Sequence, residues 1–161
     1  MQTMYVKIGS RYRPATPAEV AEVSGHYALQ TFNSERPAFE YAHSIAKYLC
    51  AVYAGRDYET FAVLFLTARH QLIECVELFR GTISGASVHP REVVKEVLWR
   101  GAAAIALAHN HPSGVADPSS ADIHITNVLT KALAIIDVPV LDHLIIGGNG
   151  TWSSMKQQGL I

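Results

Sequence analysis

Cysteine is scarce in this chain, which has only Cys50 and Cys75 and no Cys-x-x-Cys pair. A zinc cage built from thiolates is therefore excluded, because such a cage needs several closely spaced cysteines. A single disulfide between the two residues stays open, although two buried, reduced thiols are the simpler expectation. A zinc site in this sequence would use nitrogen and oxygen ligands.

The chain also lacks an excess of charge of either sign and any long hydrophobic run. Lys plus Arg number 13 and Asp plus Glu number 14, so no strong basic field is present to hold a nucleic-acid backbone. The longest apolar stretches, 101–108 and 132–141, are too short to span a bilayer, and the first residues lack the apolar segment of a signal peptide. We expect a soluble cytoplasmic protein that binds neither membranes nor duplex DNA directly.

What is present is the composition of one globular domain with an unusual content of histidine. Of the 161 residues, 49% are hydrophobic and 17% are charged, which excludes a disordered chain and allows a sizeable core. No internal repeat or low-complexity segment occurs. Eight residues are histidines, and their positions carry more information than any other feature of the composition.

Hydrophobic patterning predicts a poorly patterned N-terminal arm, 1–34, with turn residues at 11–14, followed by a domain at 35–161. Ser34 and Pro37 indicate the start of its first helix. The predicted elements are a helix at 37–53, strands at 61–66 and 72–79, a helix at 89–99, a strand at 103–108, a helix at 119–134, and strands at 138–146 and 151–153. This order predicts a three-layer α/β sandwich.

Histidines and a carboxylate gather where the third of these strands ends. His109 and His111 directly follow the strand at 103–108 and are separated by one residue. If the strand continues through them, both imidazoles leave the same face. Asp122 lies on the first turn of the next helix and can return toward the strand end. Two imidazoles and a carboxylate are three ligands of a catalytic zinc site, which keeps its fourth position for water.

Each half of this pattern has a simpler explanation when it is taken alone. Ser119-x-x-Asp122 matches a helix capping box. A His-x-His pair at a strand end is usually polar surface or a local hydrogen-bonded pair. The two halves together, with Pro112, Ser113 and Gly114 between them, are harder to explain by capping. Both interpretations can hold, since Ser119 can cap the helix while its hydroxyl faces the site.

The pattern as a whole resembles the JAMM motif of the JAB/MPN metalloprotease superfamily: His-x-His, seven residues, Ser, two residues, Asp. Here it consists of His109, His111, Ser119 and Asp122, with the spacing intact. Flanking motifs resemble the RadC branch of that superfamily, and they lie at 79–82, 88–93, 108–114 and 140–147. The likeness covers about residues 35–161, although the loop at 113–119 departs from the usual Ser-Gly-Asp-Pro.

The resemblance implies a fold, a metal and a reaction. The fold is a three-layer α/β/α sandwich with a mixed central sheet, the JAB/MPN or cytidine-deaminase-like fold. His109, His111 and Asp122 would bind Zn²⁺, and a metal-activated water would cleave an amide bond of a peptide or isopeptide-linked protein substrate. Glu59 would be the general base and Ser119 would stabilise the oxyanion. No other cofactor is implied.

The choice of general base stays open between two glutamates. Glu59 precedes the buried strand at 61–66, where a carboxylate is partly desolvated and suited to proton transfer. The alternative interpretation of Glu59 is a solvated residue ahead of a strand. Glu77, inside the next strand, is the second candidate for the base, and Glu74 alternates oppositely to it. We expect Glu59.

Two other functions are compatible with the same fold. A non-catalytic MPN interaction module usually loses a metal ligand, whereas all of them are present here. A RadC-type accessory protein of DNA repair or mobile elements is the other possibility. RadC proteins carry a helix-hairpin-helix region ahead of the domain, and the residues at 1–34 show no such signature, so we do not expect DNA binding from it. A zinc deaminase would need His-x-Glu and Pro-Cys-x-x-Cys, and neither occurs.

The remaining six histidines are interpreted as structural or surface residues. His143 lies inside a predicted strand, so we expect a hydrogen-bonded core histidine. His89 stands at a helix entry, and His124 lies on a different helix face from Asp122. The others, His26, His43 and His70, have no evident partner in the sequence.

Overall fold

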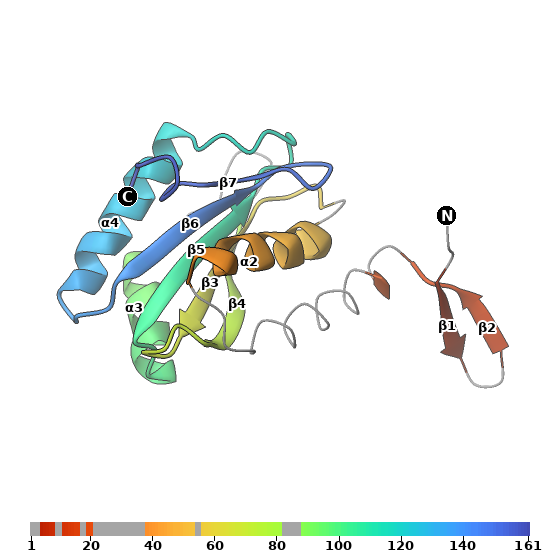
Figure 1. Ribbon diagram of the computed structural model, residues 1–161, viewed down its shortest axis with the longest axis horizontal. Coiled ribbons are helices and arrows are strands. Elements are labelled where there is room, and N and C mark those ends of the chain that lie inside the picture. The colour runs from red at the N-terminus through yellow and green to blue at the C-terminus, as the bar shows by residue number, and fades with distance from the viewer. Residues whose placement is uncertain (1–3, 9–10, 17–18, 21–37, 54–55, 82–87) are drawn as a thin grey trace.

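A computed structural model describes residues 4–8, 11–16, 19–20, 38–53, 56–81 and 88–161. Its larger sheet has five strands in the order β4-β3-β5-β6-β7 (Figure 1). The strands are β3 (Thr60–Leu66), β4 (Leu72–Arg80), β5 (Ala104–Asn110), β6 (Val140–Ile146) and β7 (Trp152–Ser154). The helices around them are α2 (Ala38–Tyr53), α3 (Pro90–Arg100) and α4 (Ser120–Ala134).

The sheet is mixed, as the resemblance implied. β3 runs antiparallel to both β4 and β5, and β6 runs antiparallel to β7. β5 and β6 are parallel, which requires the chain to cross over between them, and α4 forms that crossover. The C-terminal end of β5 and the N-terminal end of α4 therefore lie at the same edge of the sheet.

The helices cover the sheet in three layers. α2 packs on one face, where Ile45 and Leu49 belong to the same core cluster as Ala106 and Leu144. α3 and α4 cover the other face through a second cluster, which includes Val93, Val97, Leu107, Leu129 and Leu133. The predicted three-layer α/β/α sandwich is confirmed, and Figure 1 shows the sheet between α2 and the α3–α4 pair.

The two central strands, β3 and β5, are buried along their whole length because they are apolar on both faces. The sequence predicted that the third strand would end at Ala108. Instead it continues through His109 and Asn110, both of which are buried. The polar residues that follow the predicted strand therefore belong to the sheet, and strand alternation assigns each of their side chains to one face.

The N-terminal arm contains a hairpin that the sequence did not predict. β1 (Tyr5–Ile8) pairs antiparallel with β2 (Arg11–Pro14), so the turn expected at 11–14 is wrong. Both strands are short and largely exposed, so they lack the alternation of buried and polar residues that reveals a strand. The predicted helix start at Ser34 lies outside the described residues. None of the described helices is long and apolar enough to cross a membrane.

Candidate metal centre

The end of β5 and the first turn of α4 bring two histidines and an aspartate together. Nε2 of His109 lies 2.8 Å from Nε2 of His111. The carboxylate of Asp122 lies between the two rings, with Oδ1 3.1 Å from His109 Nε2 and Oδ2 3.4 Å from His111 Nε2. The Nε2 atoms of both histidines and the carboxylate of Asp122, which faces one histidine with each oxygen, therefore lie close together.

The segment after β5 is held in place by backbone hydrogen bonds. His111 N–H donates to the carbonyl of Ile146 over 2.8 Å, which extends the pairing with β6 by one residue. Gly114, in a left-handed conformation with φ 85°, accepts a hydrogen bond from Gly148 N–H at 2.9 Å. Ser153 donates to the carbonyl of Ala116 at 2.5 Å. These contacts use backbone atoms of the loop. They can therefore form although the loop sequence at 113–119 differs from the usual Ser-Gly-Asp-Pro.

Ser119 caps α4 and also contacts the candidate ligand. Its hydroxyl donates to Asp122 Oδ2 over 2.6 Å, and its backbone N–H donates to the same oxygen over 2.7 Å. In return, Asp122 N–H donates to the Ser119 hydroxyl at 3.2 Å. The capping box is confirmed. The same contacts orient the Asp122 carboxylate toward the histidines, so capping and site geometry coexist as expected.

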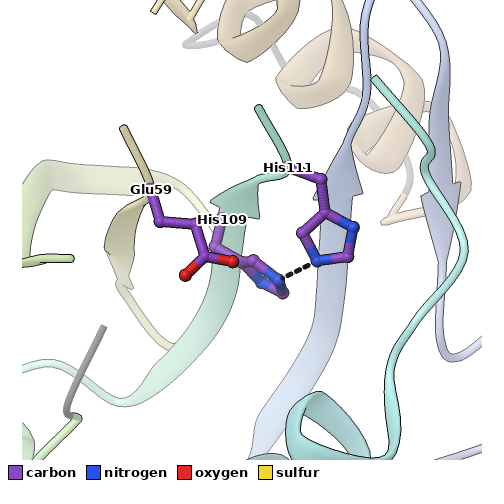
Figure 2. Close-up of side chains that lie close together, drawn as sticks. All are labelled: Glu59, His109 and His111. Atoms are coloured by element: carbon purple, nitrogen blue, oxygen red, sulfur yellow. Dashed lines mark hydrogen bonds between the residues drawn. The ribbon is translucent and has the colours of Figure 1, made fainter. Parts of the chain in front are cut away.

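Of the two candidate bases, only Glu59 lies with the histidines. Phe61 of β3 pairs opposite His109 of β5, so Glu59, two residues earlier, faces the same side of the sheet. One carboxylate oxygen of Glu59 and one ring nitrogen from each of His109 and His111 all lie within 4.8 Å of one another (Figure 2). Glu59 is half-buried.

Glu77 is placed elsewhere. It pairs across the β3–β4 ladder with Ala62, whose side chain belongs to the core cluster on the α2 face of the sheet. Its carboxylate lies 2.8 Å from the guanidinium of Arg56 and is well exposed. Glu77 therefore faces away from His109, on the opposite side of the sheet.

The residue between the two histidines has a task that sequence reasoning missed. The side chain of Asn110 accepts a hydrogen bond from Thr60 N–H at 2.8 Å and donates to the carbonyl of Tyr58 at 3.0 Å. These two contacts span the backbone on either side of Glu59. Only 3% of Asn110 is exposed. A buried amide at the end of an apolar strand was the available signal, because such a group must find partners.

A second missed feature lies behind His109. Its Nδ1 lies 2.9 Å from Nε2 of His143 on β6, and Nδ1 of His143 lies 2.6 Å from the hydroxyl of Thr126 on α4. His143 and Thr126 are fully buried. The expected hydrogen-bonded core histidine is confirmed for His143, but its partner is a candidate ligand. That partner depends on the order of β5 and β6 in the sheet, which sequence patterns did not reveal.

Burial and hydrogen bonding shift the pKa values of the groups in the site in different directions. Burial alone would raise the pKa of Asp122, but hydrogen bonds with His109 and His111 outweigh burial and hold that pKa well below its ordinary value. The hydrogen bond with Asp122 raises the pKa of His111 against the opposing effect of partial burial. Complete burial, assisted by the nearby His109, lowers the pKa of His143 well below its ordinary value. The carboxylate is therefore ionised and His143 is neutral at neutral pH.

The donor set fits a zinc ion. His111 Nδ1 lies 2.8 Å from the carbonyl of Val115, and a carbonyl can only accept, so a neutral His111 carries its lone pair on Nε2. That lone pair faces His109 Nε2 and the carboxylate of Asp122. Tetrahedral zinc with ligand distances of about 2.0–2.1 Å separates its ligands by about 3.3 Å. The two Nε2 atoms are 2.8 Å apart, and they lie 3.1 and 3.4 Å from different oxygens of the Asp122 carboxylate, so all three distances are close to that value.

Among the described residues, His43, His70, His89 and His124 and the two cysteines are not part of this cluster, and His26 lies outside the described residues. His89 is the N-cap residue of α3 and packs edge-on against Phe79, as a helix-entry residue should. His124 is exposed on α4. Cys50 and Cys75 are free thiols, as expected, but both are half-buried and neither is fully buried. Burial raises the pKa of Cys75 to about 12.

A family model described as "RadC-like JAB domain" matches residues 39–160. The chain therefore belongs to the RadC-like JAB domain family, which confirms the resemblance. A UPF0758 protein of Janthinobacterium sp. (strain Marseille) is 54% identical over 110 residues, which cover 68% of this chain and 49% of that protein. A UPF0758 protein of Methylibium petroleiphilum is 46% identical over 150 residues, 92% of this chain and 67% of that protein. The chain thus spans about half to two thirds of these relatives.

Proposed function

We propose that this protein is a zinc-dependent hydrolase of the JAMM type that cleaves an amide bond in a peptide or an isopeptide-linked protein. One observation carries the proposal. Two imidazoles and an ionised carboxylate converge on one point beside Glu59, at the edge of a buried sheet. This arrangement supports His109, His111 and Asp122 as the zinc ligands.

Bound zinc would supply a Lewis acid and lower the pKa of a coordinated water to about 7. Glu59 would take a proton from the attacking water and transfer it to the leaving amine nitrogen as the C–N bond breaks. The position of Glu59 supports this role, since it is half-buried and its backbone is held on both sides by Asn110. Glu77 is a poor candidate for the same role, because it lies on the other face of the sheet and forms an ion pair with Arg56.

Ser119 would act in two ways in this proposal. Its backbone N–H and its hydroxyl both donate to Asp122 Oδ2, which orients the proposed ligand. Stabilisation of an oxyanion would require the hydroxyl to turn from Asp122 toward the substrate, while the backbone N–H keeps Asp122 in place. One such oxyanion donor is typically worth about 10²–10³ in rate.

Metal content and hydrolysis test the proposal together. Purified protein should contain about one zinc per chain, and a His109→Ala/His111→Ala double variant should contain none. Glu59→Gln should keep the zinc but lose about 10²–10⁴ in hydrolysis of a panel of fluorogenic peptides and isopeptide-linked lysine substrates. Glu77→Gln is the matched control and should keep both properties. A chain that cannot be loaded with zinc would contradict the proposal.

The family supports a second candidate, a RadC-type accessory protein of DNA repair or mobile elements, or an MPN-type interaction module without catalysis. In either case a loaded zinc site would accompany no hydrolysis on any amide substrate, and Glu59→Gln would change nothing. The net charge of −1 argues against direct binding of duplex DNA by this chain. A gel-shift titration at low salt that shows binding by the wild-type chain would favour the accessory role.

A further inference from the structure

The loop that connects the two ligand-bearing elements, 112–118, is attached to the hairpin formed by β6 and β7. Gly148 N–H, in the turn of this hairpin, donates to the carbonyl of Gly114 over 2.9 Å. The hydroxyl of Ser153 on β7 donates to the carbonyl of Ala116 over 2.5 Å. Among the described residues, these two contacts and a longer one from the same turn to the Gly114 carbonyl are the hydrogen bonds that join the loop to another strand or helix.

The loop also occupies the space that a side chain on Gly147 would need. A β-carbon on Gly147 would lie 2.5 Å from the carbonyl oxygen of Gly114 and 3.1 Å from the β-carbon of Ala116. The Thr151 hydroxyl lies in the same space, but a side chain can rotate away, whereas these two loop atoms cannot. The φ angle of Gly147 is outside the left-handed region, so its backbone conformation also suits other residues. The close approach of the loop is therefore what requires glycine here.

The first turn of α4 depends on this attachment because it has no fully buried side chain of its own. The buried residues of α4 begin at Thr126, in the second turn, whereas Asp122 lies in the first. Between Ala116 and the N-cap residue Ser119 only two residues intervene, and one of them is Pro118, whose ring fixes its φ angle. The place where the loop is held therefore sets where α4 begins.

The same hairpin holds the histidine side of the site. His111 N–H donates to the carbonyl of Ile146 over 2.8 Å, which continues the pairing of β5 with β6. The next two residues, Gly147 and Gly148, contact the loop. Three consecutive residues of the hairpin thus touch both segments that carry the proposed ligands.

We propose that the β6–β7 hairpin is a positioning element of the candidate metal centre. In it, Gly147 and Ser153 fix the loop at 112–118 and so set the distance between Asp122 and the two histidines. The inference deepens the proposed function and rests on it for the metal. Neither Gly147 nor Ser153 belongs to the proposed ligands or takes part in the proposed hydrolytic step.

Two glycines of the hairpin separate positioning from folding. Gly147→Ala pushes on the loop without straining its own backbone. Gly150 has φ 78°, and a β-carbon there would meet no described atom within 4 Å beyond its chain neighbours, so Gly150→Ala strains the turn without touching the loop. Both variants should unfold at a lower urea concentration than the metal-free wild type. Zinc affinity, measured by competition with a chromophoric chelator, should fall about 10–100-fold in Gly147→Ala and stay unchanged in Gly150→Ala.

Ser153 provides a second pair of variants. Ser153→Ala removes the donor to the Ala116 carbonyl, whereas Ser153→Thr keeps a hydroxyl. Zinc affinity should fall about 10-fold in Ser153→Ala and be restored in Ser153→Thr. Gln158→Ala, at an exposed position after β7, is the control and should leave the affinity unchanged. Equal affinity in Ser153→Ala and the wild type would remove Ser153 from the proposal.

The same displacement can be read in metal-free protein from amide signals in ¹H–¹⁵N NMR spectra. Ser119 N–H donates to Asp122 Oδ2 and Asp122 N–H donates to the Ser119 hydroxyl, so both signals report on the start of α4. Gly147→Ala should shift both signals, whereas Gly150→Ala should shift the signals of its own turn and leave these two in place.

Wild-type zinc affinity in Gly147→Ala, or equal losses in Gly147→Ala and Gly150→Ala, would overturn the proposal, because contact with the loop would then have no effect on the site. Failure of the proposed function is distinguishable. Zinc bound with the expected order of affinities but without hydrolysis would contradict the hydrolase and leave the positioning role standing. If the wild-type chain binds no zinc, the proposed function fails, and unshifted Ser119 and Asp122 signals in Gly147→Ala would overturn the positioning role as well.

Discussion

At the scale of single residues, three consecutive positions at the end of β5 have two different tasks. His109 and His111 face the α4 side of the sheet, where Asp122 meets them. Asn110 faces the other side by strand alternation and holds the backbone around Glu59. A pleated strand thus places the proposed ligands and the support of the proposed base within one short segment.

Asn110→Ala should loosen the segment that carries Glu59. The substitution leaves the Thr60 N–H and the Tyr58 carbonyl without their partner, and such a loss costs about 1–3 kcal/mol for a buried group. We expect the free energy of unfolding to fall by about that amount in a urea titration and hydrolysis to fall, while zinc content is unchanged. Asn127→Ala, on the exposed face of α4, is the control. Unchanged stability and unchanged hydrolysis in Asn110→Ala would show that the clamp has no role.

The burial of His143 predicts how the stability of the metal-free protein depends on pH. The pKa of His143 is lowered in the fold, whereas the unfolded chain takes up a proton near its ordinary pKa of about 6.5. The unfolded state therefore binds more protons below that pH, so this contribution is present above about pH 6.5 and is lost as the pH falls, by up to about 1.4 kcal/mol per pH unit. His111 acts in the opposite sense, because its pKa is raised and its contribution is lost as the pH rises.

His143→Gln should reduce the loss of stability between about pH 7.5 and pH 5, since glutamine does not titrate. Urea titrations of the metal-free wild type and the variant at both pH values would measure the difference. His124→Gln, at an exposed histidine of α4, should retain the behaviour of the wild type. An identical pH dependence in His143→Gln and the wild type would contradict the assignment of a neutral, buried His143.

At the scale of elements, the first turn of α4 is both a helix terminus and one wall of the candidate site. Ser119 satisfies a backbone N–H at the helix start and holds the Asp122 carboxylate at the same time. The family motif combines the two uses, which explains why the capping box and the ligand pattern share the same residues. Stability and metal binding should therefore change together when the cap is removed.

Ser119→Ala should lower the free energy of unfolding by about 1 kcal/mol, the usual cost of losing an N-cap side chain. It should also weaken zinc binding, because one of the two hydrogen bonds that orient Asp122 Oδ2 is lost. Thermal unfolding and chelator competition would measure the two effects. Ser120→Ala, at the next and exposed position, is the control. A loss of stability without any change in zinc affinity would confine Ser119 to capping.

The helices and strands were largely predictable from the sequence, whereas the side-chain contacts between them were not. Continuous apolar runs indicated β3 and β5, and the family motif indicated which residues would meet at the end of β5. The extension of β5 through His109 and Asn110 could only be left open, because polar residues at a strand end are also typical of a loop. The contacts of His143 and Asn110 required the strand order, which depends on packing between segments distant in the sequence.

At the scale of the whole molecule, the candidate site uses the centre of the sheet. Glu59 stands ahead of β3, His109 lies on β5 and His143 lies on β6, and these three strands are neighbours in the sheet. The opposite face is filled by α2 and its own core cluster. A metal held between β5 and α4 would therefore join the sheet to one covering layer. Its removal should lower the stability of the whole fold.

Removal of zinc should lower the melting temperature of the protein. A ligand that binds only the folded state stabilises it by about 2.7 kcal/mol at a free concentration 100 times its dissociation constant. We expect calorimetry to show a lower transition temperature after treatment with a chelator and recovery when zinc is returned. The Asp122→Ala variant should show no shift on either treatment. An identical transition temperature with and without zinc in the wild type would contradict specific binding to the fold.

The central claim is that His109, His111 and Asp122 bind zinc at the end of β5. Anomalous diffraction at the zinc absorption edge, from crystals of the zinc-loaded protein, tests it most directly. We predict one peak within about 2.0–2.2 Å of both Nε2 atoms and of a carboxylate oxygen of Asp122. A peak on other residues, or zinc density that leaves Asp122 uncoordinated, would contradict it.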